Sequence, residues 1–290
     1  MRFGLLALLG LFWSVRLTAM KSAGLAGVHP DVVISIAAIG IAGFFSLAAL
    51  WRRRLPPTSP AALRFYAMSA AAGFIAPFFL ESVIAPNLPV FIFIVIIATM
   101  PLITLALSVV SQVEALDGRN VAAAVLGFVA AAILLFDTAM GPDGNEAELF
   151  WALAAFGVPL LYACNTVYVA ARWPAGPDAL DVAFAQAAVV SVAAAAGWLV
   201  LGDTARLGTA AFDVWALGLI ILSEGFALLI YLHLVRSLGA SFVALANYLS
   251  IFFAALLGRW LFGDPLTVLA LLAAGVLLAA LALRHRVTRS

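Results

Sequence analysis

Two ionisable residues stand deep inside long apolar stretches of the sequence, and each offers a definite chemistry there. Arg16 lies about 14 residues into the first stretch, or roughly 20 Å along a helix. A charge within hydrocarbon costs at least about 2.5–3.5 kcal/mol, so something must compensate it. Arg16 would therefore bind the carboxylate of a small ligand, pair with an acid in the same apolar region, or extend toward water.

Glu224 is the acidic counterpart, near the middle of another apolar stretch and followed by Gly225. Burial disfavours an ionised carboxylate, so Glu224 is a candidate for proton exchange near neutral pH. It could equally be a hydrogen-bonded structural acid or the ion-pair partner of Arg16. Because the two residues lie at similar depths, we also consider that together they bind the two charges of a zwitterionic amino acid.

Other polar and aromatic side chains inside the apolar stretches are candidates for the same site. Glu81 is a second candidate for proton coupling, but it lies closer to the outer end of its stretch, where water could solvate it. Buried amides and hydroxyls need partners, so the remaining candidates would either line a binding site or join helices. These expected substrate-binding residues are Trp13, Tyr162, Asn165, Asn247 and Tyr248.

Catalytic and metal-binding groups are not expected. The histidines His29, His233 and His285 are far apart, and Cys164 is the single cysteine. Neither a disulfide framework nor a thiolate metal cluster can be built from one cysteine. We therefore predict no metal and no cofactor.

The elements that must position these residues are membrane-spanning helices. The chain is 66% hydrophobic and only 10% charged, whereas a soluble domain of 290 residues must cover its core with polar side chains. A helix of roughly 20 apolar residues crosses a bilayer. We predict an all-α membrane protein with ten spans: Phe3–Gly24, Val32–Trp51, Leu63–Ala85, Leu88–Ser111, Val121–Ala139, Leu149–Ala171, Val182–Leu201, Val214–Leu234, Ser241–Phe262 and Leu266–Leu283.

Positive charge is distributed unevenly between the two sides of these spans. Eleven arginines fall on the side of the N-terminus and three cations on the other, with Arg16 between them. Cytoplasmic loops carry such an excess. We therefore expect a multi-pass protein of the cell (inner) membrane with both termini in the cytoplasm. The eleven are Arg2, Arg52, Arg53, Arg54, Arg64, Arg119, Arg172, Arg236, Arg284, Arg286 and Arg289, and the three are Lys21, Arg206 and Arg259.

The two halves of the chain resemble each other in the order of their features. Residues 1–140 hold the first five predicted spans and residues 147–290 hold the last five. The first span of each half has an aromatic residue three positions before a polar one, as in Trp13 with Arg16 and Tyr162 with Asn165. Because five is odd, the halves would cross the membrane in opposite directions, which predicts an inverted repeat.

Later features of the halves also match. Glu114 lies thirteen residues after Pro101 in the first half, and Asp264 lies thirteen after Ile251 in the second. Prolines inside three spans, at positions 77, 101 and 159, each remove a helix hydrogen bond and predict kinks.

These motifs together resemble the ten-helix EamA-type branch of the drug/metabolite transporter superfamily. The resemblance covers essentially the whole chain. It rests on Trp13-Ser14 with Lys21, on Pro101, on the segment Leu238-Gly239-Ala240-Ser241 and on Gly263-Asp264. It implies two five-helix repeats and a secondary carrier that exports amino acids or other small metabolites. Arg16 and Glu224 stand where that family more often has small or neutral residues.

The leading hypothesis is therefore a secondary active transporter working by alternating access, not an enzyme. Its partners would be a small-molecule substrate, membrane lipids and protons, with no nucleic acid, and it would act as a monomer. Two alternatives stay open: a flippase for a lipid-linked substrate, and an integral-membrane enzyme acting on lipids.

Overall fold

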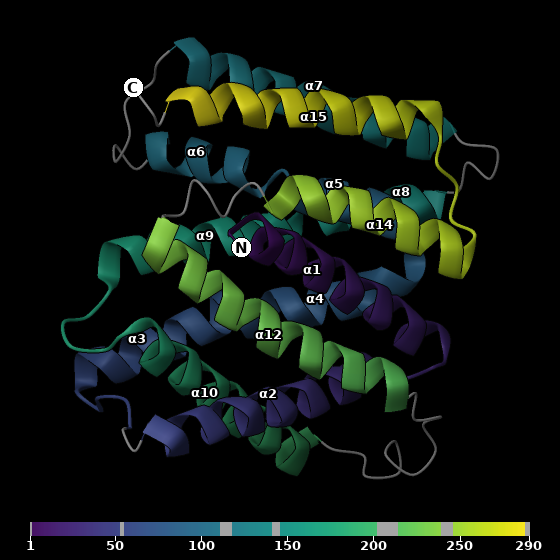
Figure 1. Ribbon diagram of the computed structural model, residues 1–290. Coiled ribbons are helices and arrows are strands. Elements are labelled where there is room, and N and C mark those ends of the chain that lie inside the picture. Colours follow the sequence, from purple (N-terminus) through teal and green to yellow (C-terminus); the bar gives the residue numbers. More distant parts are fainter. Residues whose placement is uncertain are drawn as a thin grey trace.

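The computed structural model describes residues 2–52, 55–110, 118–140, 146–201, 214–238 and 246–287, and every regular secondary-structure element among these residues is a helix (Figure 1). Each of the ten predicted spans contains at least one helix. The helices are α1 (Arg2–Leu25), α2 (Pro30–Arg52), α3 (Pro60–Ala70), the π-helical turn η1 (Ala71–Ile75), α4 (Ala76–Ile84), the 3₁₀ turn η2 (Ala85–Asn87), α5 (Val90–Ile97), α6 (Met100–Val110), α7 (Gly118–Met140), α8 (Glu146–Ala155), α9 (Gly157–Arg172), α10 (Ala179–Leu201), α12 (Val214–Leu238), α14 (Ala246–Phe262) and α15 (Val268–Val287).

The lengths of these helices confirm an all-α protein of the membrane type. Within the described residues, seven helical stretches are long and apolar enough to cross a bilayer. Three shorter apolar helices lie at Val125–Asp137, Leu249–Phe262 and Val268–Ala280. The predicted span Ser241–Phe262 is described only from Ala246 onward.

Each of the three prolines predicted to kink a span lies at or just after an interruption of the regular α-helix. Pro77 follows the π-helical turn η1, Pro101 follows the first residue of α6, and Pro159 lies in the first turn of α9. Proline has no N–H to donate, and its ring clashes with the carbonyl four residues earlier, so a regular helix cannot continue through it. The predicted third, fourth and sixth spans are consequently two-part helices, and both α4 and α9 begin inside the apolar region.

Helix α1 lies at the centre of the bundle, packed against α12 on one side and α14 on the other (Figure 1). The pair α7 and α15 forms one edge of the bundle, and the pair α2 and α10 lies at the opposite edge. Helix α9 packs against α4 and α6. The first turn of α1 and the last turn of α15 lie at the same end of the bundle (Figure 1).

The contact between α1 and α14 is unusually close. A Cβ atom on Gly10 would lie 2.9 Å from the backbone of Ala246 and of Ser250, so only glycine fits there. One turn later the Ser14 hydroxyl donates to the carbonyl oxygens of Gly10 (3.0 Å) and Ser250 (2.8 Å). Small residues allow such backbone approach between membrane helices. This contact gives the Trp13-Ser14 motif a packing role.

Burial follows the arrangement expected for a bundle surrounded by lipid. Residues Val90–Ile96 of α5 are all buried, as expected for a helix that is apolar on every face and lies inside the protein. Large apolar side chains such as Phe128 and Trp260 are 75% and 80% exposed on the outside. Such side chains would be costly to leave in water but are suited to lipid.

Candidate functional site

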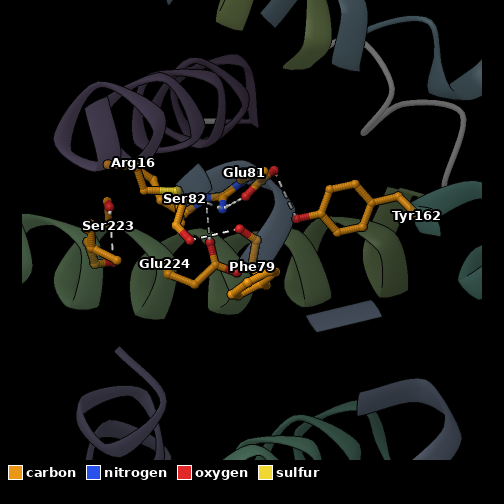
Figure 2. Close-up of polar contacts among 9 residues, drawn as sticks. Arg16, Phe79, Glu81, Ser82, Tyr162, Ser223 and Glu224 are labelled. Carbon is orange, nitrogen blue, oxygen red and sulfur yellow. Dashed lines mark hydrogen bonds and ion pairs between the residues drawn. The ribbon is translucent and has the colours of Figure 1, made fainter. Parts of the chain in front are cut away.

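Arg16 lies at the centre of a buried cluster of charged residues (Figure 2). Its two terminal nitrogens face the two carboxylate oxygens of Glu81 on α4. The Nη2–Oε1 hydrogen bond is 3.0 Å long, and Nη1 forms the second, shorter contact with Oε2. This two-point contact is the strongest geometry available to a guanidinium and a carboxylate.

Glu81 was expected near the outer end of its span, where water could solvate it, and that expectation is wrong. Its side chain has 0% exposure, because the π-helical turn and Pro77 lead directly into α4, which packs between α1, α2 and α9. Position along a span does not reveal what covers a residue. A carboxylate so enclosed needs a partner, and Arg16 supplies it.

Glu224 on α12 is the second carboxylate at Arg16. Its Oε2 lies 3.1 Å from Arg16 Nε, within ion-pair distance, although the N–H is not aligned for a hydrogen bond. Its side chain retains 18% exposure. The predicted pairing of Arg16 with Glu224 is therefore present, but Arg16 shares its charge between two acids.

Tyr162 completes the cluster from a fourth helix, α9. Its hydroxyl donates to Glu81 Oε1 at 3.2 Å (Figure 2). The ring of Phe78 also supports Arg16, with its centroid 5.2 Å from the guanidinium carbon. Such a cation–π contact is favourable in a site withdrawn from water. The residues Arg16, Glu81, Tyr162 and Glu224 are hereafter called the central cluster.

The central cluster is not balanced in charge. Among the described residues it contains one permanent cation and two carboxylates. If both carboxylates were ionised, one negative charge would be left uncompensated within the bundle, which is costly. The cluster therefore suits the binding of one further positive charge, either a proton or a cationic group of a ligand.

Two other predicted site residues, Trp13 and Asn165, make their contacts outside this cluster. Trp13 packs with Phe12 against a separate apolar cluster that includes Leu9 and Ala227. Asn165 lies one turn beyond Tyr162 on α9, and its side chain fills the space beside Gly73, where a Cβ atom would come within 2.2 Å of Nδ2.

Asn247 and Tyr248 belong to the first turn of α14, and the side chain of Tyr248 is outside the description. Helix α14 meets α1 on the side of Ser14, while the central cluster lies on the side of Arg16. Residues two apart on a helix point to different faces. The contact of α14 with α1 therefore lies on a different face of α1 from the central cluster.

Sequence reasoning did not find a second buried ion pair, between Lys21 and Asp264. Lys21 Nζ lies 2.6 Å from Asp264 Oδ1, and the other oxygen of Asp264 accepts the N–H of Val90 at 2.7 Å. The ammonium also lies 4.7 Å from the centre of the Phe262 ring. This pair joins α1, the start of α5 and the segment after α14.

The backbone around two glycines places Asp264 in this pair. Gly263 has φ of +68°, a left-handed conformation that glycine adopts easily and that ends α14. A Cβ atom on Gly258 would lie 2.9 Å from Asp264 Oδ2. The Gly-Asp motif thus directs the Asp264 carboxylate toward the interior of the bundle. Glu114, its predicted equivalent in the first half, lies outside the described residues.

Residues 2–136 match the model of the EamA-like transporter family. The resemblance inferred from the sequence motifs is thereby confirmed for residues 2–136. This match and the apolar helices indicate a multi-pass membrane protein of a kind that transports small molecules. Arg16 and Glu81 lie within the EamA-like half, whereas Tyr162 and Glu224 come from the other half.

The similarity in fold extends beyond the EamA-like half. One solved crystal structure covers 98% of this chain and 97% of its own chain, with a TM-score of 0.61 and 16% sequence identity. At this identity the likeness concerns the fold alone. No curated protein matches the chain.

Proposed function

We propose that the protein is a secondary active transporter of small molecules that works by alternating access, with the central cluster as its substrate-binding and coupling site. The observation that carries this proposal is Arg16 held between Glu81 and Glu224. Ionisable residues inside membrane spans are costly and commonly mark substrate or proton pathways. The EamA-like half supports a carrier over an enzyme, since its family consists of transporters.

Glu224 is the coupling residue in this proposal. Its carboxylate is part-exposed, whereas Glu81 is enclosed and bound to both terminal nitrogens of Arg16. The groups that face Glu224 in the cluster are Arg16 and, more distantly, Glu81 and Tyr162. A proton that binds Glu224 removes the excess negative charge and leaves Arg16 balanced by Glu81. Protonation and deprotonation would thus change the charge of the site by one unit.

The pairing of helices supports two inverted repeats, residues 1–140 and 147–290. In a repeat of five spans, each contact in one half should have an equivalent five spans along the chain. The contact of α1 with α12, the first and eighth spans, corresponds to that of α9 with α4, in the sixth and third spans. The contact of α1 with α14 likewise corresponds to that of α9 with α6, and the pairs α2–α10 and α7–α15 map onto themselves. Ten spans in this arrangement would enclose a pathway in a monomer.

The site lies where such a transporter would bind its substrate. The central cluster draws on the first, third, sixth and eighth predicted spans, two from each half. In carriers with inverted repeats, substrate and coupling ions bind at the repeat interface, next to broken helices. Here α4 and α9 both begin at a proline-associated break close to their cluster residues.

We place the protein in the cell (inner) membrane with both termini in the cytoplasm. The excess of arginines on the side of the N-terminus supports this orientation. The matching positions of the start of α1 and the end of α15 are consistent with it (Figure 1). The Lys21–Asp264 pair would then lie toward the outer side.

The test is uptake of labelled amino acids and related metabolites into proteoliposomes, with and without a pH gradient. We expect gradient-dependent transport by the wild type and loss of that dependence in Glu224→Gln. Export of amino acids is the expected physiological direction. If no compound on the panel moves, the amino-acid assignment fails, and lipid-linked substrates become the next set to assay.

A further inference from the structure

We propose that the substrate carries an ammonium group that binds at Glu224, and that anions without an ammonium group are excluded. This inference rests on the proposed transport function and deepens it by naming the class of substrate. It differs from the expectation that Arg16 binds the carboxylate of the substrate. Two features of the central cluster support it, the occupation of Arg16 and the unequal burial of the two acids. Aromatic rings around the next two residues of α12 suggest the body of such a substrate.

The guanidinium of Arg16 is already occupied by protein groups. Its two terminal nitrogens face the two oxygens of Glu81, and its Nε lies 3.1 Å from Glu224. A carboxylate ligand would have to displace one of these acids to reach Arg16. It would also bring a third carboxylate to a cluster with one permanent cation, which Coulomb repulsion in a poorly solvated site opposes.

The two acids differ in the access they offer to a ligand. Glu81 has 0% exposure, and its Oε1 accepts two hydrogen bonds, from Arg16 and from Tyr162. Glu224 has 18% exposure and a single ion-pair contact. The carboxylate that is both accessible and only partly neutralised is therefore Glu224, and the ligand charge that completes it is positive.

Aromatic side chains from three helices pack around Gly225 and Phe226, the two residues that follow Glu224 on α12. The ring of Phe44 on α2 packs against Gly225, where a Cβ atom would lie 3.2 Å from the ring. Phe226 on α12 contacts both Phe44, at 5.5 Å between ring centres, and Phe12 on α1, at 5.8 Å. Ring faces attract organic ammonium groups and accommodate apolar bodies. Along α12, the surroundings next to Glu224 are therefore suited to an amine with an apolar or aromatic body.

An ammonium group and a proton would bind the same carboxylate and so exclude each other. When the ammonium is bound, Glu224 must be ionised. When the ammonium leaves, a proton restores the balance of charge with Arg16 and Glu81. This exchange is how a single residue would link substrate movement to proton movement.

The experiment compares ligands that share a skeleton and differ in charge. One set is phenethylamine, phenylalanine and 3-phenylpropanoate, and the other is isopentylamine, leucine and 4-methylpentanoate. Binding to the purified full-length chain is measured by isothermal titration calorimetry, and uptake is measured in proteoliposomes. The variants are Glu224→Gln and the charge-conserving Glu224→Asp, with Glu146→Gln on the exposed start of α8 as a matched control.

We expect members of at least one set that carry an ammonium group to bind, and both anions to fail. Glu224→Gln should weaken that binding on the order of 30-fold or more, because it removes one member of a desolvated charge pair. Glu224→Asp should keep the preference for ammonium compounds with lower affinity, and Glu146→Gln should match the wild type.

Three results would overturn the proposal: an anion that binds as tightly as its amine, failure of every ammonium compound to bind, or a folded Glu224→Gln with wild-type affinity. Failure of the transport function is seen separately. If the anions alone accumulate under a pH gradient, the transporter stands and the substrate class is wrong. If amines bind but never cross the membrane, the binding site stands and the transport function is wrong.

Discussion

Helix α1 carries two buried cations, and their surroundings differ in one respect that matters. Lys21 faces a single carboxylate, and both oxygens of that carboxylate have partners, Lys21 itself and the N–H of Val90. Arg16, five residues earlier and about 7.5 Å along the helix axis, faces two carboxylates, one of them part-exposed. The Lys21–Asp264 pair is therefore complete as it stands, whereas the central cluster has room for another positive charge.

This comparison distinguishes an ion pair that stabilises the fold from a cluster that can bind a ligand or a proton. A complete pair holds three segments of the chain together and gains nothing from a ligand. An incomplete cluster changes its charge when it binds a proton or an ammonium group. The two should therefore respond differently when single charges are removed, and the variants below range from the largest expected loss of stability to the smallest.

Removing Arg16 should have the largest effect. Arg16→Met leaves Glu81 and Glu224 facing each other without a cation, and breaking a buried charge cluster in this way costs about 3–5 kcal/mol. We expect a large fall in the Tm of the detergent-purified protein and loss of transport. The double variant Arg16→Met with Glu81→Gln should recover part of the Tm, because it leaves one carboxylate that can be protonated. A wild-type Tm for Arg16→Met would contradict the described cluster.

Removing Lys21 should have a smaller effect. Lys21→Met leaves Asp264 without its cation, but Asp264 keeps the N–H of Val90. We expect a loss of about 2–3 kcal/mol, the low end for a buried charge pair that loses one partner. Thermal unfolding checks this, with Arg172→Met on the exposed end of α9 as the control, for which less than about 1 kcal/mol is expected. Equal losses in both variants would contradict a buried role for Lys21.

An uncharged hydrogen bond on the same helix provides a reference for these expected losses of stability. Ser14→Ala removes the hydroxyl that joins α1 to the Ser250 carbonyl. Hydrogen bonds between membrane helices contribute about 0.6 kcal/mol on average, so a loss of that order is expected. Ser223→Ala should cost less, since the Ser223 hydroxyl donates only within its own helix. The ratio of the two Tm shifts measures what the contact between helices adds.

Removing Glu224 should have the smallest effect on stability among the charged residues, while transport loses its dependence on the pH gradient. Glu224→Gln leaves Arg16 balanced by Glu81, so we expect a change in unfolding free energy within about 1 kcal/mol. In contrast, Asp264→Asn removes the charge from the complete pair and should cost more. Measurement of Tm for both variants, together with uptake driven by a pH gradient, tests the comparison directly. A Glu224→Gln protein less stable than Asp264→Asn would reverse our assignment of the two sites.

Several features of the molecule followed from local sequence. The length of each apolar run predicted the helices, because the bilayer thickness sets how many residues a span needs. Pro77, Pro101 and Pro159 predicted the helix breaks, because a proline ring obstructs its own helix whatever surrounds it. Arg16, Glu224, Tyr162 and Glu81 were all recognised as candidates, since polar groups in apolar spans are few.

The grouping of these candidates did not follow from the sequence. Arg16 and Glu81 are 65 residues apart, and Lys21 and Asp264 are 243 apart, so no local pattern links them. Trp13 and Asn165 were expected to line the same site on the same reasoning, yet they lie at other helix contacts. Periodicity tells which residues share a face of one helix, but not which face another helix covers.

The sequence alone determined that the chain is an all-α membrane protein, where its helices break, and which few residues have chemistry to offer. These three facts depend on the solvent and on single residues, so they follow from the sequence without knowledge of which helices pack together. Only the tertiary structure decided that Glu81 is enclosed with Arg16 while Glu224 stays part-exposed, and that Lys21 has a partner of its own. The energy of a buried charge depends on what surrounds it in three dimensions, and that is fixed by the packing of helices distant in the chain.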